Sequence, residues 1–164
     1  MFIQGDNMSR QIARKKSHTS LLNSDTRDLE MESVPFQIHE QYLENLYRQY
    51  NIRVNHALLF YVEDVTEPII FVDKTEINIG RQDEMGRIMP ELDLSVFNGA
   101  ELGVSRLHSK IVHINGQYLI QDLHSTNFTW LNGHKLLPYQ YTPIPDGSII
   151  QIGRLAMNVF VIKR

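Results

Sequence analysis

From Ala57 onward, apolar residues recur at every second position in short runs. A period of two places successive side chains on opposite faces of an extended strand, so each run predicts a half-buried β-strand. Turn-forming residues separate the runs at 66–68, 115–116, 132–133 and 146–147. The alternating residues are Leu58, Phe60 and Val62; Thr75, Ile77 and Ile79; Ile150 and Ile152; and Leu155, Met157, Val159 and Val161. This pattern predicts an all-β sandwich, and the absence of strand–helix–strand alternation argues against a nucleotide-binding α/β fold.

Two polar segments bracket the most clearly marked hairpin in the chain. Residues 110–114 and 117–122 are predicted strands joined at Asn115-Gly116, a pair that tolerates the positive φ angles of a two-residue turn. Because a hairpin brings its outer ends together, we expect residues 105–108 to lie beside residues 125–129. These segments offer hydroxyls, an amide and a guanidinium and contain no carboxylate. Such a surface suits a phosphate or another oxyanion.

The segment between Arg81 and Ser105 is the least regular part of this region. It contains three glycines and a proline, and only residues 92–94 have the pattern of a short edge strand. We interpret the rest as a long loop, and loops of this length are often functional.

Four groups of residues resemble, in order and spacing, the forkhead-associated (FHA) domain family. They are Gly80-Arg81, Ser105-Arg106-Leu107-His108, Ser125-Thr126-Asn127-Phe128-Thr129 and Asn132-Gly133. The resemblance covers roughly residue 57 to the C-terminus. It implies a β-sandwich that binds phosphothreonine in partner proteins, without enzymatic activity, and that therefore acts in signalling downstream of a Ser/Thr kinase.

The resemblance also implies a role for each polar residue of the two segments. Arg81 would contact the phosphate or the peptide backbone, and its planar guanidinium can donate two parallel hydrogen bonds. Ser105 would donate its hydroxyl to a phosphate oxygen, and Arg106 would contact phosphate or peptide. Thr126 would supply a hydroxyl or a backbone N–H to the phosphate, whereas Asn127 would bind the peptide main chain just after the phosphothreonine.

Gly80 and His108 are expected to support the site structurally. In the family this histidine braces the two loops through hydrogen bonds, and a histidine without a nucleophile or carboxylate beside it is seldom catalytic. Phe128 departs from the family pattern, which usually has glycine there. Either the turn has an ordinary conformation at this position, or the loop is shifted, or the ring packs against the incoming peptide.

Composition excludes several other classes of protein. The chain has 164 residues, a net charge of −3 and no cysteine, which argues against general nucleic-acid binding and rules out disulfides and thiolate metal sites. No apolar run approaches the ~20 residues of a membrane-spanning helix, and the N-terminus lacks the apolar core of a signal peptide. We expect a cytoplasmic protein without a cofactor or a metal site.

The chain before the sandwich divides into two predicted parts. Residues 1–33 are polar and unpatterned and predict a flexible tail. Residues 34–52 predict an amphipathic helix, because Phe36, Leu43, Leu46, Tyr47 and Tyr50 share one face. That face could pack on its own β-domain (residues 55–164) or form a homodimer or partner contact. The alternative function is a scaffold subunit that does not read phosphate and interacts through this helix.

The tail contains two threonines in contexts that suit the predicted site. Thr19 lies three residues after Lys16 and has Leu22 three residues downstream, and Thr26 has Leu29 in the same relative position. Family members often read the side chain three places after the phosphothreonine. Phosphorylated Thr19 or Thr26 is therefore a candidate ligand for the protein's own site or for that of a neighbour.

Overall fold

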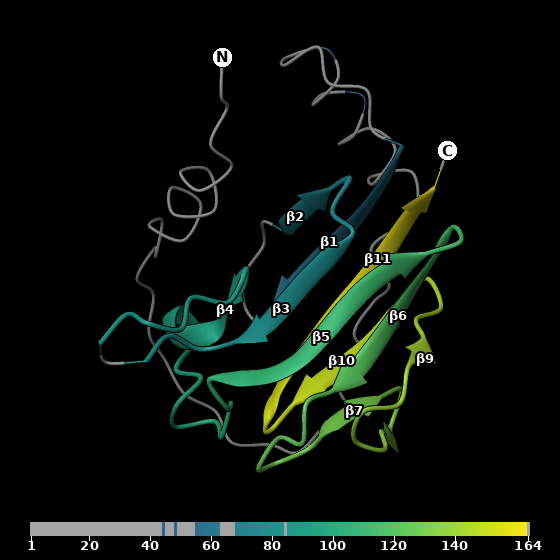
Figure 1. The fold of residues 1–164 in the computed structure, drawn as a ribbon. Helices are drawn as coiled ribbons and strands as arrows, with labels where there is room; N and C mark the ends of the chain where they lie inside the picture. The colour runs from purple at the N-terminus through teal and green to yellow at the C-terminus, as the bar shows by residue number, and fades with distance from the viewer. Residues whose placement is uncertain (1–43, 45–47, 49–54, 63–67, 84, 164) are drawn as a thin grey trace, which may run out of the picture. The chain divides into compact units, whose positions relative to one another are not determined.

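Strands dominate the described chain, as the alternating pattern predicts. The computed structural model describes residues 44, 48, 55–62, 68–83 and 85–163 (Figure 1). The strands are β1 (His56–Val62), β2 (Ile69–Val72), β3 (Glu76–Gly80), β4 (Leu92–Asp93), β5 (Leu107–Ile114), β6 (Gln117–Asp122), β7 (Thr129–Leu131), β8 (His134–Lys135), β9 (Thr142–Pro143), β10 (Ser148–Ile152) and β11 (Leu155–Lys163). The prediction of an all-β sandwich is confirmed.

The strands form two sheets that pack face to face. One has six strands in the order β2-β1-β11-β10-β7-β8, and the other has five in the order β4-β3-β5-β6-β9. In Figure 1, β5 and β6 of the five-stranded sheet pass in front of β10 and β11. The two sheets are largely antiparallel, the exception being the parallel pair of β3 and β4.

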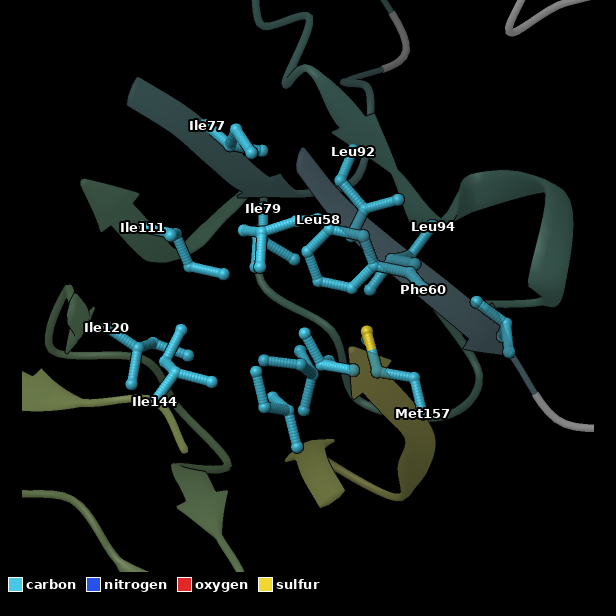
Figure 2. Packing of buried hydrophobic residues seen from close by; sticks show 14 of the residues in the cluster. Leu58, Phe60, Ile77, Ile79, Leu92, Leu94, Ile111, Ile120, Ile144 and Met157 are labelled. Atoms are coloured by element: carbon cyan, nitrogen blue, oxygen red, sulfur yellow. The ribbon is translucent and has the colours of Figure 1, made fainter. Parts of the chain in front are cut away.

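The apolar faces of the two sheets meet in one hydrophobic core. Phe60, Ile150 and Met157 come from the six-stranded sheet, whereas Ile79 and Ile111 come from the five-stranded sheet, and all five side chains are fully buried. Figure 2 shows side chains from both sheets converging on this interior. Burial of one such side chain stabilises the fold by about 1.5–3 kcal/mol, so the core fixes which strand ends meet at each end of the sandwich.

The β5–β6 hairpin has the predicted turn, and a polar loop adjoins each of its outer ends. Asn115 and Gly116 have φ angles of 50° and 74°, and the register pairs Ile111 with Ile120. At the turn end of this hairpin, the ring of His113 stacks on that of His56 with 3.8 Å between centroids. The start of β1 therefore lies beside this turn, whereas residues 105–108 and 123–128 lie at the opposite end.

Strict alternation fails in the two central strands of the six-stranded sheet. Leu59 is as fully buried as Leu58, although alternation predicts that only one of the two faces the core. In β11 the pattern slips after Val159, so that Phe160 and Ile162 are buried while Val161 is half-buried. Leu59 pairs with Phe160 across the two strands, and the Phe160 ring packs edge to face on that of Tyr61, so apolar side chains also gather on the outer face of this sheet.

The segment between Arg81 and Ser105 holds the short edge strand β4, as predicted, and a 3-10 helix that the sequence pattern did not reveal. This helix spans Leu94–Phe97, and the Asp93 carboxylate at its N-terminus accepts a hydrogen bond from the Ser95 N–H. Because β4 pairs in parallel with the end of β3, the helix lies close to Gly80 and Arg81.

The chain divides into two compact units, Met1–Asn51 and Ile52–Arg164. Within the first unit, Glu44 and Arg48 are helical and form an ion pair of 3.6 Å between Arg48 Nη2 and Glu44 Oε2. The remainder of the predicted tail (1–33) and helix (34–52) lies outside the described residues. No helix in the described part of the chain is long and apolar enough to cross a membrane.

Candidate functional site

His108 connects the two polar loops at the end of the sandwich. Its Nδ1 accepts a hydrogen bond from the Ser105 N–H at 2.9 Å, so the ring proton resides on Nε2, which donates to the Phe128 carbonyl at 3.0 Å. The side chain is fully buried, and this burial holds the pKa of His108 below its ordinary value despite the opposing effects of the Phe128 bond and Asp122. A neutral imidazole thus ties residues 105 and 128 together.

Gly80 allows β3 to approach the loop before β5. A Cβ atom at Gly80 would lie 2.1 Å from the Arg106 carbonyl oxygen, so only glycine fits this contact. The same oxygen accepts a hydrogen bond of 3.2 Å from the Arg81 N–H. The side chains of Arg81 and Arg106 consequently start from adjacent backbone positions.

Arg81 uses one part of its guanidinium to hold the loop. Its Nε donates to the Val104 carbonyl at 2.8 Å, and its Nη1 makes a long contact of 3.5 Å with the Gln82 carbonyl. No hydrogen-bond partner of Nη2 occurs among the described residues. The guanidinium is therefore fixed in position while part of its donor edge remains available to a ligand.

Ser105 and Thr126 meet across the two loops. The Ser105 hydroxyl accepts a hydrogen bond of 3.3 Å from the Thr126 N–H, which leaves its own proton free to donate. Ser105 is half-buried, whereas Thr126 is exposed. This pair presents hydroxyl donors to solvent at the point where the loops touch.

Asn127 lies where the β6–β7 loop, the loop before β5 and the β10–β11 turn contact one another. Its Nδ2 donates to the Gly103 carbonyl at 2.9 Å, which leaves Oδ1 free to accept a hydrogen bond. A Cβ atom at Gly103 would lie 2.5 Å from this Nδ2, and Gly103 has a φ angle of +81°. The Arg154 N–H donates to the Leu102 carbonyl at 2.8 Å, so the β10–β11 turn also contacts the loop that contains Gly103.

A buried carboxylate that sequence reasoning missed organises the β6–β7 loop. Asp122 Oδ1 accepts hydrogen bonds of 2.6 Å from the hydroxyls of Ser125 and Thr129, and Oδ2 accepts one of 3.1 Å from the Ser125 N–H. Burial alone would raise the pKa of Asp122, but these hydrogen bonds outweigh it and hold the pKa below its ordinary value. The signal was available, since Asp122 shares the inward face of β6 with Tyr118 and Ile120, and a buried carboxylate needs donors.

Phe128 has a left-handed backbone with a φ angle of +64°, so the turn does not have the ordinary conformation that was one of the expectations. The residue thus takes a conformation that glycine adopts at lower cost, at a strain of about 1–2 kcal/mol. Its carbonyl is held by His108 and by the Gly153 N–H, and the residue is 41% exposed. The Lys135 ammonium lies 3.0 Å from the centroid of this ring.

The carboxylate of Asp83 lies within electrostatic range of Arg106. The Ile88 N–H donates to Asp83 at 2.9 Å, and chiefly for this reason the pKa of Asp83 lies below its ordinary value, with a smaller contribution from the charge of Arg106. The segments 105–108 and 125–129 contain no carboxylate, but Asp83 is near enough to Arg106 to feel its charge. The exposed Arg106 side chain therefore acts in a mixed electrostatic environment.

The structure thus brings all five predicted contact residues to the same end of the sandwich. Ser105 and Thr126 are in direct contact, and Arg81 and Arg106 are joined through their backbones. Asn127 bonds the loop that precedes Ser105, while Gly80 and His108 support the loops from within. No group of three or more histidine, aspartate or glutamate side chains in the described residues is arranged to hold a metal ion.

Comparison with known proteins identifies this arrangement. Residues 77–153 match the sequence model of the FHA domain. The chain is 30% identical over 107 residues to protein FraH of Nostoc sp., a match that covers 65% of this chain and 36% of FraH. The chain therefore spans little more than a third of that relative.

Two solved structures illustrate the similarity in fold. The FHA domain of an Arabidopsis thaliana hypothetical protein is 26% identical, with a TM-score of 0.50 over 65% of this chain and 82% of that one. The N-terminal FHA domain of S. cerevisiae Rad53p, solved in complex with a phosphothreonine peptide, is 20% identical, with a TM-score of 0.50 over 65% of this chain and 94% of that one. At 20% identity the second likeness shows the fold alone.

Proposed function

Because the chain carries a forkhead-associated domain, we propose that it is a non-enzymatic module that binds phosphothreonine peptides. It would thereby mediate phosphorylation-dependent protein–protein interactions in signalling, downstream of a Ser/Thr kinase and in the cytoplasm. Members of this family typically bind phosphothreonine peptides, and the residues at the end of this sandwich offer the donors that such a ligand needs.

The observation that carries the proposal is the convergence of unused donors at the loop junction. The Ser105 and Thr126 hydroxyls lie on the two loops that His108 joins, and the guanidinium of Arg81 is bonded to the Val104 carbonyl next to Ser105. A phosphate has several acceptor oxygens and two negative charges near neutral pH, and charge-assisted hydrogen bonds to such oxygens are the strong ones. The free Oδ1 of Asn127 could accept a peptide N–H beside the phosphate.

The number of donors predicts a modest affinity. A hydrogen bond to a charged group contributes about 1.5–3 kcal/mol. Three or four such bonds, less the cost of ordering a flexible peptide, leave about −8 kcal/mol. This corresponds to a dissociation constant of about 1 μM, which suits a reversible interaction in signalling.

The partners follow from the proposed chemistry. One candidate is a phosphothreonine-containing protein, and another is the chain's own N-terminal region phosphorylated at Thr19 or Thr26, which would bind in cis or to a second copy in a homodimer. Both threonines lie outside the described residues. The acidic net charge gives no support to a nucleic acid as the main partner.

Phe128 favours a second candidate function, a scaffold subunit that keeps the fold, does not read phosphate and interacts through residues 34–52. Its ring occupies a place in the ligand loop where the family usually has glycine. Against this alternative, Arg81, Ser105 and Asn127 are present at the same end of the sandwich. The two functions differ in whether phosphorylation of a peptide changes its binding.

The test compares matched fluorescent peptides by fluorescence anisotropy on the full chain. A phosphothreonine library should give binders of about micromolar affinity, whereas the unphosphorylated forms should not bind. Phosphoserine forms should bind several-fold more weakly, since the threonine methyl group alone is worth about 0.8 kcal/mol when buried. Equal binding of phosphorylated and unphosphorylated peptides would favour the scaffold.

Variants of Arg81 connect the binding to the site. Arg81→Ala should weaken phosphopeptide binding at least about tenfold, because it removes one charge-assisted contact. Arg81→Lys should recover only part of this loss, since lysine lacks the planar fork. Arg87→Ala is the matched control, because Arg87 lies in the same loop and is 75% exposed in an ion pair with Asp83. Thermal melts should show that each variant is folded.

A further inference from the structure

The Phe128 ring is held at a fixed place on the surface next to Asn127. Its backbone is anchored by two hydrogen bonds to its carbonyl, from His108 Nε2 at 3.0 Å and from the Gly153 N–H at 3.2 Å. The next residue, Thr129, is fully buried and bonds Asp122. With both sides fixed, the partly exposed ring has little freedom to leave the loop junction.

Lys135 is brought to this ring by the short β7–β8 hairpin. Lys135 pairs with Trp130 across the hairpin, and the Leu136 N–H bonds the Thr129 carbonyl at 2.9 Å. The ammonium lies 3.0 Å from the ring centroid, a cation–π contact that fixes the position of its charge. No carboxylate of the described residues lies within 4.0 Å of this ammonium.

We propose that Lys135, positioned by Phe128, recognises an anionic side chain that flanks the phosphothreonine of a bound peptide. This inference rests on the proposed function and goes beyond it, because it concerns the peptide sequence rather than the phosphate. Phe128 follows Asn127 in the loop whose Thr126 bonds Ser105, so we expect a peptide bound at Ser105 and Thr126 to pass close to the ring and the ammonium. A fixed ammonium that has no carboxylate partner among the described residues suits a carboxylate or a second phosphate on that peptide.

The expected preference is modest because Lys135 is exposed. Exposed ion pairs contribute about 0.2–1 kcal/mol, which corresponds to a preference of up to about fivefold. Because the Phe128 ring already holds the Lys135 side chain in place, less side-chain entropy is lost on binding. We therefore expect a preference near the upper end of this range. The preference should shrink as salt increases, because exposed charges are screened over about 10 Å at 0.1 M salt.

The experiment measures the affinity of the full chain for a set of phosphothreonine peptides. In each peptide, one position from three before to four after the phosphothreonine carries Glu, Gln or phosphoserine, and the rest are alanine. Isothermal titration of wild type, Lys135→Met, Lys135→Glu and Phe128→Gly then gives the Glu/Gln ratio at each position. Glycine at 128 removes the ring at a φ angle that glycine tolerates. Lys74→Met is the control, since Lys74 is exposed before β3, at the opposite end of the sheet.

We expect one position at which wild type prefers Glu over Gln by about two- to fivefold. Lys135→Met should abolish this preference, Lys135→Glu should reverse it, Phe128→Gly should reduce it and Lys74→Met should leave it intact. The phosphoserine arm shows whether a second phosphate binds better than a carboxylate. The inference is overturned if no position shows the preference in wild type, or if Lys135→Met retains it, while the alanine phosphopeptide still binds. Failure of every phosphopeptide to bind would overturn the proposed function and the inference together.

Discussion

At the scale of single residues, the protonation state of His108 controls whether the two loops stay joined. Its Nδ1 must be unprotonated to accept the Ser105 N–H, while Nε2 donates to the Phe128 carbonyl. A second proton would turn Nδ1 into a donor that faces another donor, inside a fully buried pocket. The site therefore depends on a histidine that contacts no ligand in the proposed function.

The depressed pKa of His108 predicts a loss of stability in mildly acidic solution. The unfolded chain takes up a proton near pH 6.5, whereas the folded chain resists it because the ring is buried. The contribution of neutral His108 to the free energy of unfolding is therefore fully present above about pH 6.5. It falls as the pH decreases toward the lower pKa of the folded state. Urea unfolding from pH 8 to pH 5 should show this fall.

The variant His108→Gln should flatten this dependence while lowering stability at pH 8. The pKa of His113 is also lowered, first by burial, so that part of the slope should remain in the variant. His113→Gln is thus the natural companion, with an unaltered binding site. A wild-type stability that is constant from pH 8 to pH 5 would contradict the assigned protonation state of His108.

Asp122 contrasts with His108, because Asp122 must be charged in the folded state whereas His108 must be neutral. Its pKa is below the ordinary aspartate value, so it stabilises the fold above about pH 4 and this contribution is lost as the pH falls further. Asp122→Asn should lower the free energy of unfolding at pH 7 by about 1–3 kcal/mol and weaken the dependence on acid below pH 4. Asp146→Asn is the control, since Asp146 is exposed and accepts a single backbone bond from Val161. Equal losses in the two variants would contradict this account.

Residue types that carry a family pattern could be placed from the sequence, whereas residues that depend on three-dimensional partners could not. Ser105, Thr126 and Asn127 were predicted to lie together because a hairpin joins their loops. The φ angle of Phe128 was not predictable, since it is imposed by bonds from His108 and Gly153, which are distant in sequence. Its pairing with Lys135 likewise depends on the β7–β8 hairpin.

At the scale of elements, the contact between the end of β3 and the loop before β5 leaves no room for a side chain at Gly80. Gly80→Ala places a Cβ 2.1 Å from the Arg106 carbonyl oxygen, so the backbone must shift and the Arg81–Arg106 bond weakens. We expect a stability loss of about 1–3 kcal/mol together with weaker phosphopeptide binding.

Gly116→Ala is the matched control for this element. It lies at the other end of the β5–β6 hairpin, where an added Cβ meets no atom within 4 Å. Its φ angle of +74° makes alanine cost about 1–2 kcal/mol, so stability should fall comparably. Phosphopeptide affinity, corrected for the folded fraction, should fall in Gly80→Ala only. Equal affinities would show that the β3 contact does not shape the site.

Local turn and alternation patterns in the sequence predicted the strands. Departures from strict alternation depended on packing between distant residues. The Asn115-Gly116 turn and the bounds of β6 follow from local sequence alone. The burial of Leu59 and the slip at Phe160 do not, because they depend on which side chains pack on the outer face of the sheet. The 3-10 helix at Leu94–Phe97 is short and held by Asp93, with no helical period to reveal it.

At the scale of the whole molecule, the N-terminal region offers a possible internal ligand. If Thr19 or Thr26 is phosphorylated, the covalent connection gives it an effective concentration of about 1 mM at the site. An external phosphopeptide should then bind at least about tenfold more weakly, or the protein should dimerise through exchange of its N-terminal region. Anisotropy titrations and light scattering, before and after phosphorylation in vitro, measure both outcomes. Thr19→Ala/Thr26→Ala protein treated identically is the control, and unchanged affinity with a monomeric protein would exclude such self-binding.

The strand that begins the sandwich and the strand that ends it are direct neighbours, since His56 pairs with Lys163. This meeting point lies at the end of the sandwich where His56 stacks on His113, remote from Ser105 and Asn127. The first and last strands of the domain therefore begin and end on the same side, opposite the site loops. Such a module can be spliced into a surface loop of a host protein, or circularly permuted by joining its ends, while its opposite rim stays open to solvent. An inserted copy between two fluorescent proteins would be a natural format for a reporter of threonine phosphorylation.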